Sequence, residues 1–500
     1  MAGDSNDMPT AALTATDENG WEGTAAPTVI GPTYRSAADG RVVSLSVPCP
    51  GVSPAVFLAA ARGGERFFWE DVRQDISYAG FGVAANLLAW GPERFDHIHA
   101  QARALFAGAR LLSAAPDLAA PRLFGGFSFR DDFIPDELWA SFHPAHFVLP
   151  HYQFVRVGDE PWLTLNVLVP VDELPQEGDV ESLRAELEGA LRERVAQLQE
   201  AETAPAQPRH PAPERVRYPM AYEAWAQKIE TARAAIAGGD LKKVVLARIC
   251  ELHFARRVDV DAALAFLNRR YNDCYRFLFE PRPHHAFYGA TPELLVSVHG
   301  DRLRTMALAG SIRRSDDGRE DEALGQQLLA SEKDRHEHQL VVLSILGRLG
   351  LLTHSLEMSP QPGVYKLRNI QHLLTPLSAH LKEDVGVMNV VQALHPTPAL
   401  GGSPRGQALA FIREHEPEPR GWYAAPVGWL AYRPDGAPGD ELDGAFAVAI
   451  RSAVSRDHTA WLYAGAGIVG ASEPEKEWAE TALKFRPMLN ALGAPEAAAV

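Results

Sequence analysis

Three charged residues near the C-terminus share one face of an expected helix. Glu477, Glu480 and Lys484 stand at positions i, i+3 and i+7, which places them on one side of an α-helix. The simplest interpretation is a solvated ion pair between Glu480 and Lys484. Alternatively, the two carboxylates could join Glu337, which precedes the apolar run LVVLSIL, to hold a hard divalent cation through oxygen.

Two further charged residues border apolar strands. Lys243 begins the run KVVLARICELHF, and Glu293 immediately precedes LLVSV. A charge within an apolar strand is costly to bury. Each residue therefore either lies at a strand end in contact with solvent or has a chemical function, and the residues alone leave both interpretations open.

Two motifs point to sites that their context does not support. GAGIVG at 465–470 matches the dinucleotide fingerprint, but the chain ends at residue 500, too soon for the second strand and acidic residue of that unit. We expect these glycines to let the backbone approach an anion closely instead. His336 and His338 point about 200° apart on a helix and cannot share a metal, so we expect both on a solvated face.

The elements that must position these residues follow from apolar periodicity and from Gly and Pro punctuation. Short apolar runs between residues 41 and 169 predict strands around one helix. This helix is expected at 95–112, and further helices at 179–201, 221–237, 319–349 and 474–489. Further expected strands cover 242–254, 275–279, 286–298, 445–454 and 460–469.

Composition limits the class of protein. The chain has 500 residues, is 46% hydrophobic and carries a formal charge of −16, which argues against a nucleic-acid or anionic-membrane partner. Its three cysteines are too few for a disulfide framework or a four-cysteine zinc site. No apolar run approaches the roughly 18 residues of a membrane span, and the N-terminus lacks the features of a secretory signal. We expect a reduced, cytoplasmic setting.

The chain divides by composition into four segments. Residues 1–40 resemble a disordered acidic tail, and residues 41–203 form the first folded part. A Pro-rich linker follows at 204–217, and residues 218–492 form the larger part, which holds the residues with chemical potential.

Ten motifs occur in an order that resembles one known family, the chorismate-utilising enzymes. They are KVVLAR (243–248), YGATPELL (288–295), ALAGS (307–311), SEKDRHEHQLV (331–341), IQHL (370–373), HPTPALGGSP (395–404), GWYAAPVGW (421–429), FAVAIRSA (446–453), YAGAGIV (463–469) and EWAETALK (477–484). The family includes isochorismate, salicylate, anthranilate and aminodeoxychorismate synthases. The resemblance covers nearly all of 217–490 and implies an α+β fold with large antiparallel sheets flanked by helices, and a site between them.

Within this family the nucleophile separates the branches. Members that add water resemble this chain in having Lys at position 243, whereas ammonia-using members usually carry Gln there; aminodeoxychorismate synthases have a Lys where this chain has Ala309. The resemblance therefore implies an isochorismate synthase without a glutaminase partner. Salicylate synthase is the alternative, although ALAG rather than PLAG at 307–310 favours release of isochorismate. Anthranilate synthase component I is less similar, and a non-catalytic chorismate-binding protein would be expected to lack Lys243 or Glu293.

The resemblance also implies roles for individual residues. Lys243 would be the general base that activates water, and Glu293 the general acid for the departing hydroxyl. Mg²⁺ would be held by Glu337 and Glu480, with Glu477 acting through water. The remaining expected substrate-binding positions are Gly310, Ser311, His372, Tyr423, Arg451, Gly465, Gly467 and Lys484.

Overall fold

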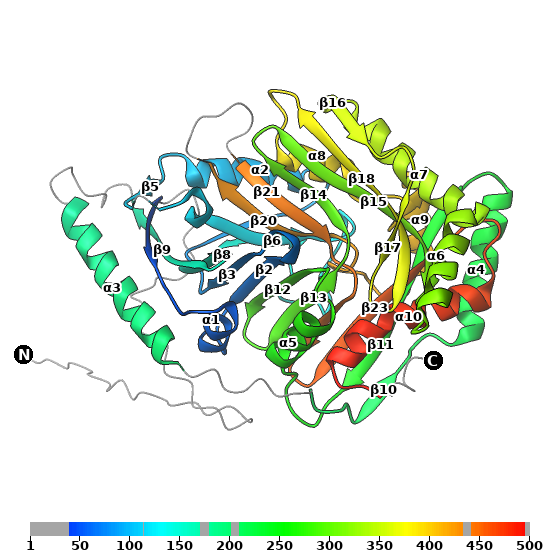
Figure 1. Ribbon diagram of the computed structural model, residues 1–500, viewed down its shortest axis with the longest axis horizontal. Helices are drawn as coiled ribbons and strands as arrows, with labels where there is room; N and C mark the ends of the chain where they lie inside the picture. Colours follow the sequence, from blue (N-terminus) through cyan, green and yellow to red (C-terminus); the bar gives the residue numbers. More distant parts are fainter. Residues whose placement is uncertain (1–39, 114, 171–179, 202–209, 434–441, 496–500) are drawn as a thin grey trace, which may run out of the picture.

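The computed structural model describes residues 40–113, 115–170, 180–201, 210–433 and 442–495. The expected acidic tail lies outside the described residues except for residue 40, and so does the first half of the Pro-rich segment, 204–209. Within the described ranges, the strands form two sheets, one of 13 strands and one of 10 (Figure 1). Among the described strands, every pair is antiparallel except β1 with β5, which is parallel.

The larger sheet, called sheet 1 below, has the strand order β10-β11-β23-β22-β13-β12-β2-β3-β8-β9-β1-β5, and β19 pairs with β11. Its strands are β1 (Gly40–Pro48), β2 (Arg66–Asp71), β3 (Ile76–Phe81), β5 (Arg110–Leu111), β8 (Tyr152–Val157), β9 (Glu160–Pro170), β10 (Arg215–Arg217), β11 (Lys243–His253), β12 (Tyr275–Arg282), β13 (His285–Thr291), β19 (Gly402–Ser403), β22 (Ser452–Arg456) and β23 (Thr459–Ile468).

The smaller sheet, sheet 2, has the order β16-β18-β15-β14-β21-β20-β6-β7-β4, and β17 pairs with β18. Its strands are β4 (Ala85–Ala89), β6 (Arg122–Phe127), β7 (Ala145–Leu149), β14 (Leu294–His299), β15 (Arg302–Arg313), β16 (Thr353–Met358), β17 (Gly363–Lys366), β18 (Ile370–Leu381), β20 (Pro426–Tyr432) and β21 (Leu442–Val448).

Both halves of the chain build both sheets. In sheet 1, β2 from the first part pairs with β12 from the second. In sheet 2, β6 pairs with β20. Aromatic residues fill the space between the sheets, where Phe67 of β2 stacks on Phe124 of β6. The two parts therefore share one framework on both sides of the Pro-rich segment.

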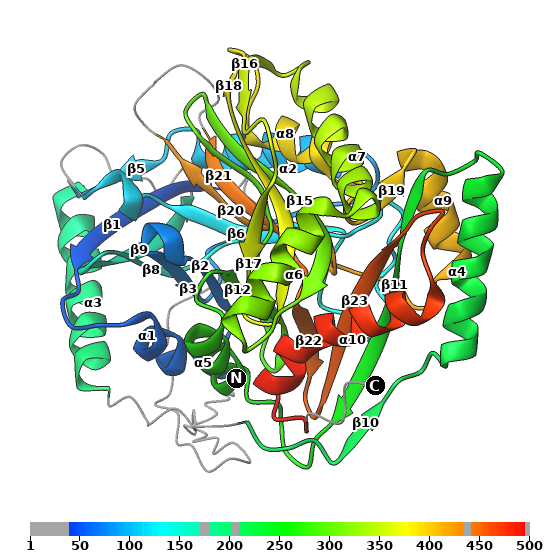
Figure 2. The same cartoon turned by 45° about the vertical axis from the view of Figure 1, so that its right-hand side comes forward.

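Helices cover the outer faces and ends of these sheets. They are α1 (Pro54–Ala60), α2 (Arg94–Phe106), α3 (Val180–Glu200), α4 (Tyr222–Ala237), α5 (Val260–Arg270), α6 (Gly318–Ala330), α7 (Glu332–Leu349), α8 (Val387–Leu394), α9 (Arg405–His415) and α10 (Pro474–Ala491). Helix α10 packs on β23 beside α4, and α7 packs on β15 and β18 (Figure 2). This architecture confirms the expected α+β fold with antiparallel sheets and flanking helices.

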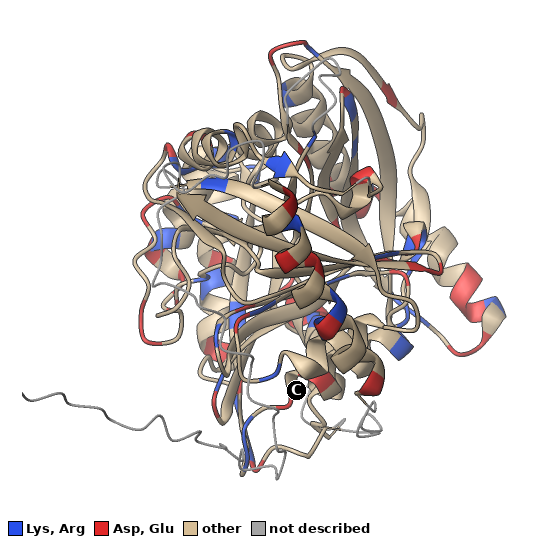
Figure 3. Ribbon diagram, turned by 90° about the vertical axis from the view of Figure 1, so that its left-hand side faces the viewer, with Lys and Arg blue, Asp and Glu red and all other residues tan. Residues whose placement is uncertain are grey.

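The distribution of charged residues along the chain and the hydropathy of the helices are two further features of the fold. Acidic and basic residues are interspersed along the ribbon in the view of Figure 3. In the part of the chain that the structure describes, no helix combines the length and apolar character needed to cross a bilayer.

The single helix expected over 319–349 is wrong, because two helices meet at Ser331. Its backbone is extended, with φ −65° and ψ 114°, and its hydroxyl accepts the N–H of Asp334 at 3.3 Å. Serine is a favoured N-cap residue because its side chain satisfies such a free N–H group. The cap restarts the chain as α7, the helix that carries Glu337.

Two further expected strands are each divided between the sheets. The run over 286–298 splits at Pro292 and Glu293, since β13 belongs to sheet 1 and β14 to sheet 2. The run over 445–454 splits in the same way between β21 and β22, and Arg451 in the connection has φ 53°. A positive φ ends regular strand geometry. These two crossings place Glu293 and Arg451 between the sheets.

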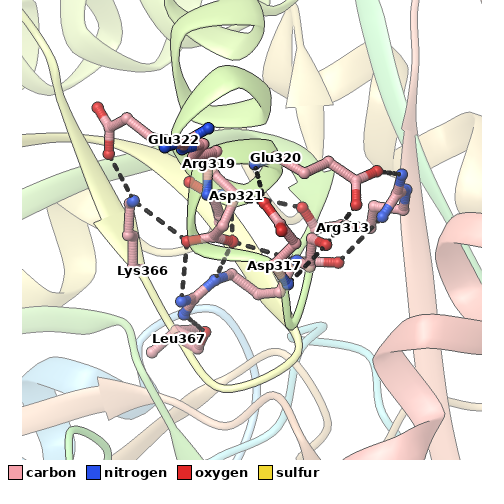
Figure 4. Close-up of polar contacts among 11 residues, drawn as sticks. Arg313, Asp317, Arg319, Glu320, Asp321, Glu322, Lys366 and Leu367 are labelled. Carbon is pink, nitrogen blue, oxygen red and sulfur yellow. Dashed lines mark hydrogen bonds and ion pairs between the residues drawn. The ribbon is translucent and has the colours of Figure 1, made fainter.

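A surface network anchors the turn between β15 and α6 (Figure 4). Asp317 caps α6 by accepting the N–H groups of Arg319 and Glu320 at 2.9 Å each. Asp321 accepts Arg314 Nε at 2.6 Å and Lys366 Nζ at 3.1 Å. The network fixes the end of β15, the strand that contains Gly310 and Ser311.

Candidate active site

An ion pair joins the start of β11 to helix α7. Lys243 Nζ donates to Glu337 Oε1 at 2.8 Å, and the Lys243 side chain is 0% exposed. A Cβ atom at Gly467 on β23 would lie 2.9 Å from Lys243 Cε and 2.8 Å from Glu337 Oε1. Glycine therefore lets β23 pass directly beside the pair. The interpretation of Lys243 as a solvated strand end is wrong.

Glu293 is presented by a tight turn between the sheets. The N–H of Glu293 donates to Thr291 Oγ1 at 3.2 Å, and that hydroxyl donates to the Val448 carbonyl at 2.7 Å. The Glu293 carbonyl accepts the Val448 N–H at 3.0 Å. These bonds hold the backbone rigidly and leave the carboxyl group free to face the site. Sequence analysis missed Thr291, although a Thr two residues before a polar residue is typical of a side-chain turn.

The environment of Glu293 favours its protonated form. Burial raises the pKa of its carboxyl to about 8, against the opposing effect of Lys243, Arg451 and Lys484. Desolvation penalises the charged form of a carboxyl group more than these three cations stabilise it here. Glu293 is thus mostly protonated at neutral pH and can donate a proton.

Arg451 is held by a buried histidine. The Arg451 Nη2 atom lies 3.5 Å from His372 Nε2. On the other side of the ring, His372 Nδ1 lies 3.0 Å from Ser311 Oγ and 3.1 Å from the Gly310 carbonyl. Burial and the nearby cations Arg451 and Lys484 lower the pKa of His372 to about 3. A neutral ring with Nδ1–H donating to Gly310 leaves Nε2 to accept from Arg451.

Tyr423 and two glycines form another wall. The Tyr423 ring stacks on Tyr463 with centroids 5.0 Å apart, and a Cβ at Gly465 would lie 3.4 Å from the Tyr423 hydroxyl. Gly465 and Gly467 oppose Ala247 and Val245 of β11, whose N–H groups point away from β23. At a non-hydrogen-bonded position of an antiparallel pair, both opposing residues turn their N–H and C=O groups away from the partner strand. The N–H groups of both glycines therefore face away from β11, as an anion-binding role requires.

Each of the three carboxylates expected to hold a cation has a lysine partner. Glu337 pairs with Lys243 as described above. Glu477 of α10 accepts Lys333 of α7 at 2.9 Å. On the next turn, Glu480 accepts Lys484 at 2.6 Å, and Lys484 also donates to the Gly465 carbonyl at 2.8 Å. The ion pair expected between Glu480 and Lys484 is therefore present, but it is largely shielded from solvent rather than solvated, since the two side chains are 25% and 13% exposed.

The pKa values of the α10 carboxylates reflect their closeness. Burial and the negative charge of Glu480 raise the pKa of Glu477. The Glu480 side chain is 25% exposed, and Lys484 and Lys333 lower its pKa against the opposing effect of desolvation. Lys333 interacts electrostatically with Glu477, Glu480 and Glu337 together. One ammonium group thus lies among all three carboxylates, and sequence analysis missed this lysine.

These residues fit a hard divalent cation by their chemistry. Carboxylate oxygens are the ligands that Mg²⁺ takes from proteins, and buried carboxylates that raise one another's pKa favour a nearby cation. In the described residues, however, no group of three or more His, Cys, Asp or Glu side chains lies close enough together to hold a metal ion. Lysine ammonium groups occupy the positions beside Glu337, Glu477 and Glu480 instead.

The two histidines next to Glu337 differ in their surroundings. His336 is exposed, as expected. The same expectation is wrong for His338, which is buried with Nε2 2.8 Å from Thr375 Oγ1. His338 shares the i, i+3, i+7 stripe of Val341 and Ile345, the face of α7 that packs on sheet 2.

A cavity of about 450 Å³ lies elsewhere, between the turn after β2 and the strands of sheet 2. Arg73, Tyr275, Arg304 and Met306 contribute to its lining, and none of the predicted site residues does. Leu294, the neighbour of Glu293, also lines it. We place the candidate site at the buried charged groups, because general acid–base chemistry needs titratable groups that face one another.

Comparisons with known proteins agree with this geometry. The family model for chorismate binding enzymes matches residues 30–493. A salicylate biosynthesis isochorismate synthase from Pseudomonas aeruginosa is 37% identical over 430 residues, covering 85% of this chain and 84% of the relative. Isochorismate synthase MenF from Bacillus subtilis is 34% identical over 440 residues, covering 86% of this chain and 88% of the relative.

Solved structures show the same fold. The menaquinone-specific isochorismate synthase MenF from Escherichia coli superposes with a TM-score of 0.73 at 29% identity, covering 91% of this chain and 95% of that one. Anthranilate synthase component I from Streptococcus pneumoniae gives a TM-score of 0.64 at 20% identity, covering 84% and 93% of the two chains. The chain therefore belongs to the family of chorismate-binding enzymes.

Proposed function

We propose that this protein is an isochorismate synthase that converts chorismate to isochorismate in the presence of Mg²⁺. The observation that supports the proposal is that Lys243 and Glu293, a buried lysine and a buried carboxylic acid, interact electrostatically in the interior. The names of the relatives agree with this activity. We further propose that it acts in the cytoplasm and supplies either menaquinone or siderophore synthesis.

The reaction replaces one hydroxyl group by another. Lys243, in its amine form, accepts a proton from water as the water oxygen attacks C2 of the ring. The ring double bonds shift, and the C4–O bond breaks while Glu293 donates its proton to the departing hydroxyl, which leaves as water. One water enters and one leaves, so the substrate is isomerised. Glu337 has to move away from Lys243 before the amine can act.

Other side chains orient the substrate. Arg451, held by His372, and Tyr423 are proposed to bind the enolpyruvyl carboxylate, because a guanidinium group binds carboxylates through two hydrogen bonds. Gly465 and Gly467 would supply backbone N–H groups, and Gly310 and Ser311 would line the pocket. Glu337 and Glu480, with Glu477 through water, would hold Mg²⁺. The metal would supply a positive charge for the ring carboxylate, while Lys484 would balance the surrounding negative charge.

Product analysis tests this function. The purified protein is incubated with chorismate and Mg²⁺, and the products are separated by chromatography while salicylate fluorescence and pyruvate are recorded. We expect isochorismate without equimolar pyruvate. Salicylate and pyruvate in equal amounts would instead identify a salicylate synthase.

Metal removal tests the proposed carboxylate roles. We expect EDTA to abolish turnover and added Mg²⁺ to restore it. Full turnover after exhaustive chelation would contradict the roles of Glu337, Glu480 and Glu477.

A further inference from the structure

The outer edge of β11 lacks a continuous neighbouring strand in the described part of the chain. β19 pairs with Lys243 and Val244, and β10 pairs with residues 251–253. Between them, the Val245 N–H donates to the Gly401 carbonyl at 2.9 Å. The Val245 carbonyl and the Ala247 N–H still need partners, because buried backbone groups without hydrogen bonds are costly.

Two side chains from the segment after α9 take the place of the missing strand. Glu416 Oε1 accepts the Ala247 N–H at 2.8 Å, and Arg420 Nη2 donates to the Val245 carbonyl at 2.8 Å. The same two side chains bind each other, with Arg420 Nε 2.8 Å from Glu416 Oε2 and Arg420 Nη2 2.6 Å from Glu416 Oε1. Both are buried.

Arg420 also contacts Leu400, Phe129 and Tyr423. Its Nη1 atom donates to the Leu400 carbonyl at 2.9 Å, and its guanidinium carbon lies 4.2 Å from the centre of the Phe129 ring. Its backbone carbonyl accepts the Tyr423 N–H at 2.8 Å. The pair therefore joins the strand that carries Lys243 to the turn that carries Tyr423.

We infer that Glu416 and Arg420 are positioning residues for the reaction, which fix the strand of Lys243 against the turn of Tyr423. The inference rests on the proposed roles of Lys243 and Tyr423. Glu416 and Arg420 contact the backbone of Val245, Ala247 and Tyr423, and they act through these backbone contacts. Small shifts of a catalytic group lower the rate strongly, because the reacting atoms must meet in a narrow range of distance and angle.

The test compares Glu416→Gln with a matched variant, Glu280→Gln. Glu280 is also buried, and it also accepts an arginine, Arg66 Nε at 2.7 Å, and a backbone N–H, that of His284 at 2.9 Å. Both variants lose one buried charge from an arginine pair and should lose comparable thermal stability. We expect Glu416→Gln to lower kcat at least tenfold, and Glu280→Gln to leave kcat within twofold of the wild type.

Arg420→Lys supplies a second variant that keeps the positive charge. A lysine cannot replace the fork that reaches Glu416, Leu400 and Val245 together, so we expect a similar loss of kcat. Hydrogen exchange measured on the peptide covering residues 243–253 should accelerate in both Glu416→Gln and Arg420→Lys, and stay unchanged in Glu280→Gln.

Two results would overturn the inference. One is equal kcat in Glu416→Gln and Glu280→Gln at equal loss of stability. The other is failure of both Glu416→Gln and Arg420→Lys to fold while Glu280→Gln folds, which would make the pair a requirement of folding alone. A different result would show that the proposed base role of Lys243 is wrong: the Lys243→Ala variant would then retain its activity.

Discussion

Two buried charge clusters in this protein are built from different residue types. Beside β2 and β12, Arg66 Nε donates to Glu280 at 2.7 Å and Arg66 Nη1 donates to Asp261 at 2.8 Å, and Arg276 pairs with Glu70. These positive groups are guanidinium groups, which stay charged and bind carboxylates in fixed geometry. Despite burial, Arg66 and Arg62 lower the pKa of Asp261.

At the candidate site, by contrast, lysines hold the carboxylates through single ammonium contacts. Lys243, Lys333 and Lys484 each pair with one glutamate, and Glu293 has a pKa raised to about 8 by burial. A carboxylic acid with this pKa changes protonation near neutral pH, and an ammonium group binds a carboxylate as a point charge without the fixed fork of a guanidinium group. The first cluster therefore holds charges in place, whereas the second is suited to moving protons and exchanging cations.

The strongest test of this comparison removes the proposed base. Lys243→Ala should lower kcat by about 10²–10⁴-fold, the usual contribution of a general base. The adjacent exposed lysine provides the control, since Lys242→Ala removes the same group one residue away. Steady-state kinetics with chorismate measures both variants. Equal activity in the two would show that Lys243 has no catalytic role.

Glu293→Gln should separate activity from stability. We expect loss of kcat by about 10²-fold or more, together with a gain in the free energy of unfolding at pH 8. The unfolded chain releases the Glu293 proton above the ordinary pKa of 4.5, while the folded chain keeps it up to about 8. Folding stability from this group is therefore present below pH 4.5 and is lost as pH rises toward 8.

A glutamine at position 293 does not ionise, so it removes the loss of folding stability that the wild type shows as pH rises toward 8. Urea unfolding at pH 5 and pH 8 should show Glu293→Gln gaining at least about 1 kcal/mol over the wild type between the two values. Glu280→Gln should lose stability at both. Identical pH dependence of unfolding in the wild type and Glu293→Gln would contradict a buried, protonated acid.

The pH dependence of turnover follows from the same carboxyl group. As pH rises through about 8, Glu293 loses the proton it must donate, so kcat/KM should fall by up to about tenfold per pH unit above that value. Lys243, Arg451 and Lys484 face the carboxyl group, and all three favour its ionised form. A kcat/KM that stays constant to pH 10 would exclude Glu293 as the acid.

The smallest expected effect concerns Lys333. Its ammonium group is 32% exposed and lies among the proposed metal ligands, so it competes with a dication for their charge. Lys333→Met should therefore bind Mg²⁺ several-fold more tightly in titration calorimetry without substrate. Lys476→Met removes an exposed lysine from the same helix as Glu477 and should not change the affinity. Weaker Mg²⁺ binding in Lys333→Met would show that Lys333 supports the metal site.

Local sequence determined the parts of the site that lie within one element. The spacing of Glu477, Glu480 and Lys484 was sufficient to place them on one face of α10, since helical periodicity depends on neighbouring residues alone. Helix α10 and strand β11 were likewise predicted close to their observed bounds. Ten ordered motifs were sufficient to indicate the family and its fold.

Tertiary structure decided which charges are buried and which meet. The alternation of β11 is the same whether Lys243 lies in solvent or in the interior, and its burial depends on α7, about 90 residues further along the chain. Glu293 and Arg451 meet because two apparent strands cross between sheets, and Glu416 and Arg420 reach β11 only across the fold. Periodicity fixes the side of an element on which a residue lies, whereas long-range packing sets its solvent exposure and its partners, and these determine its chemistry.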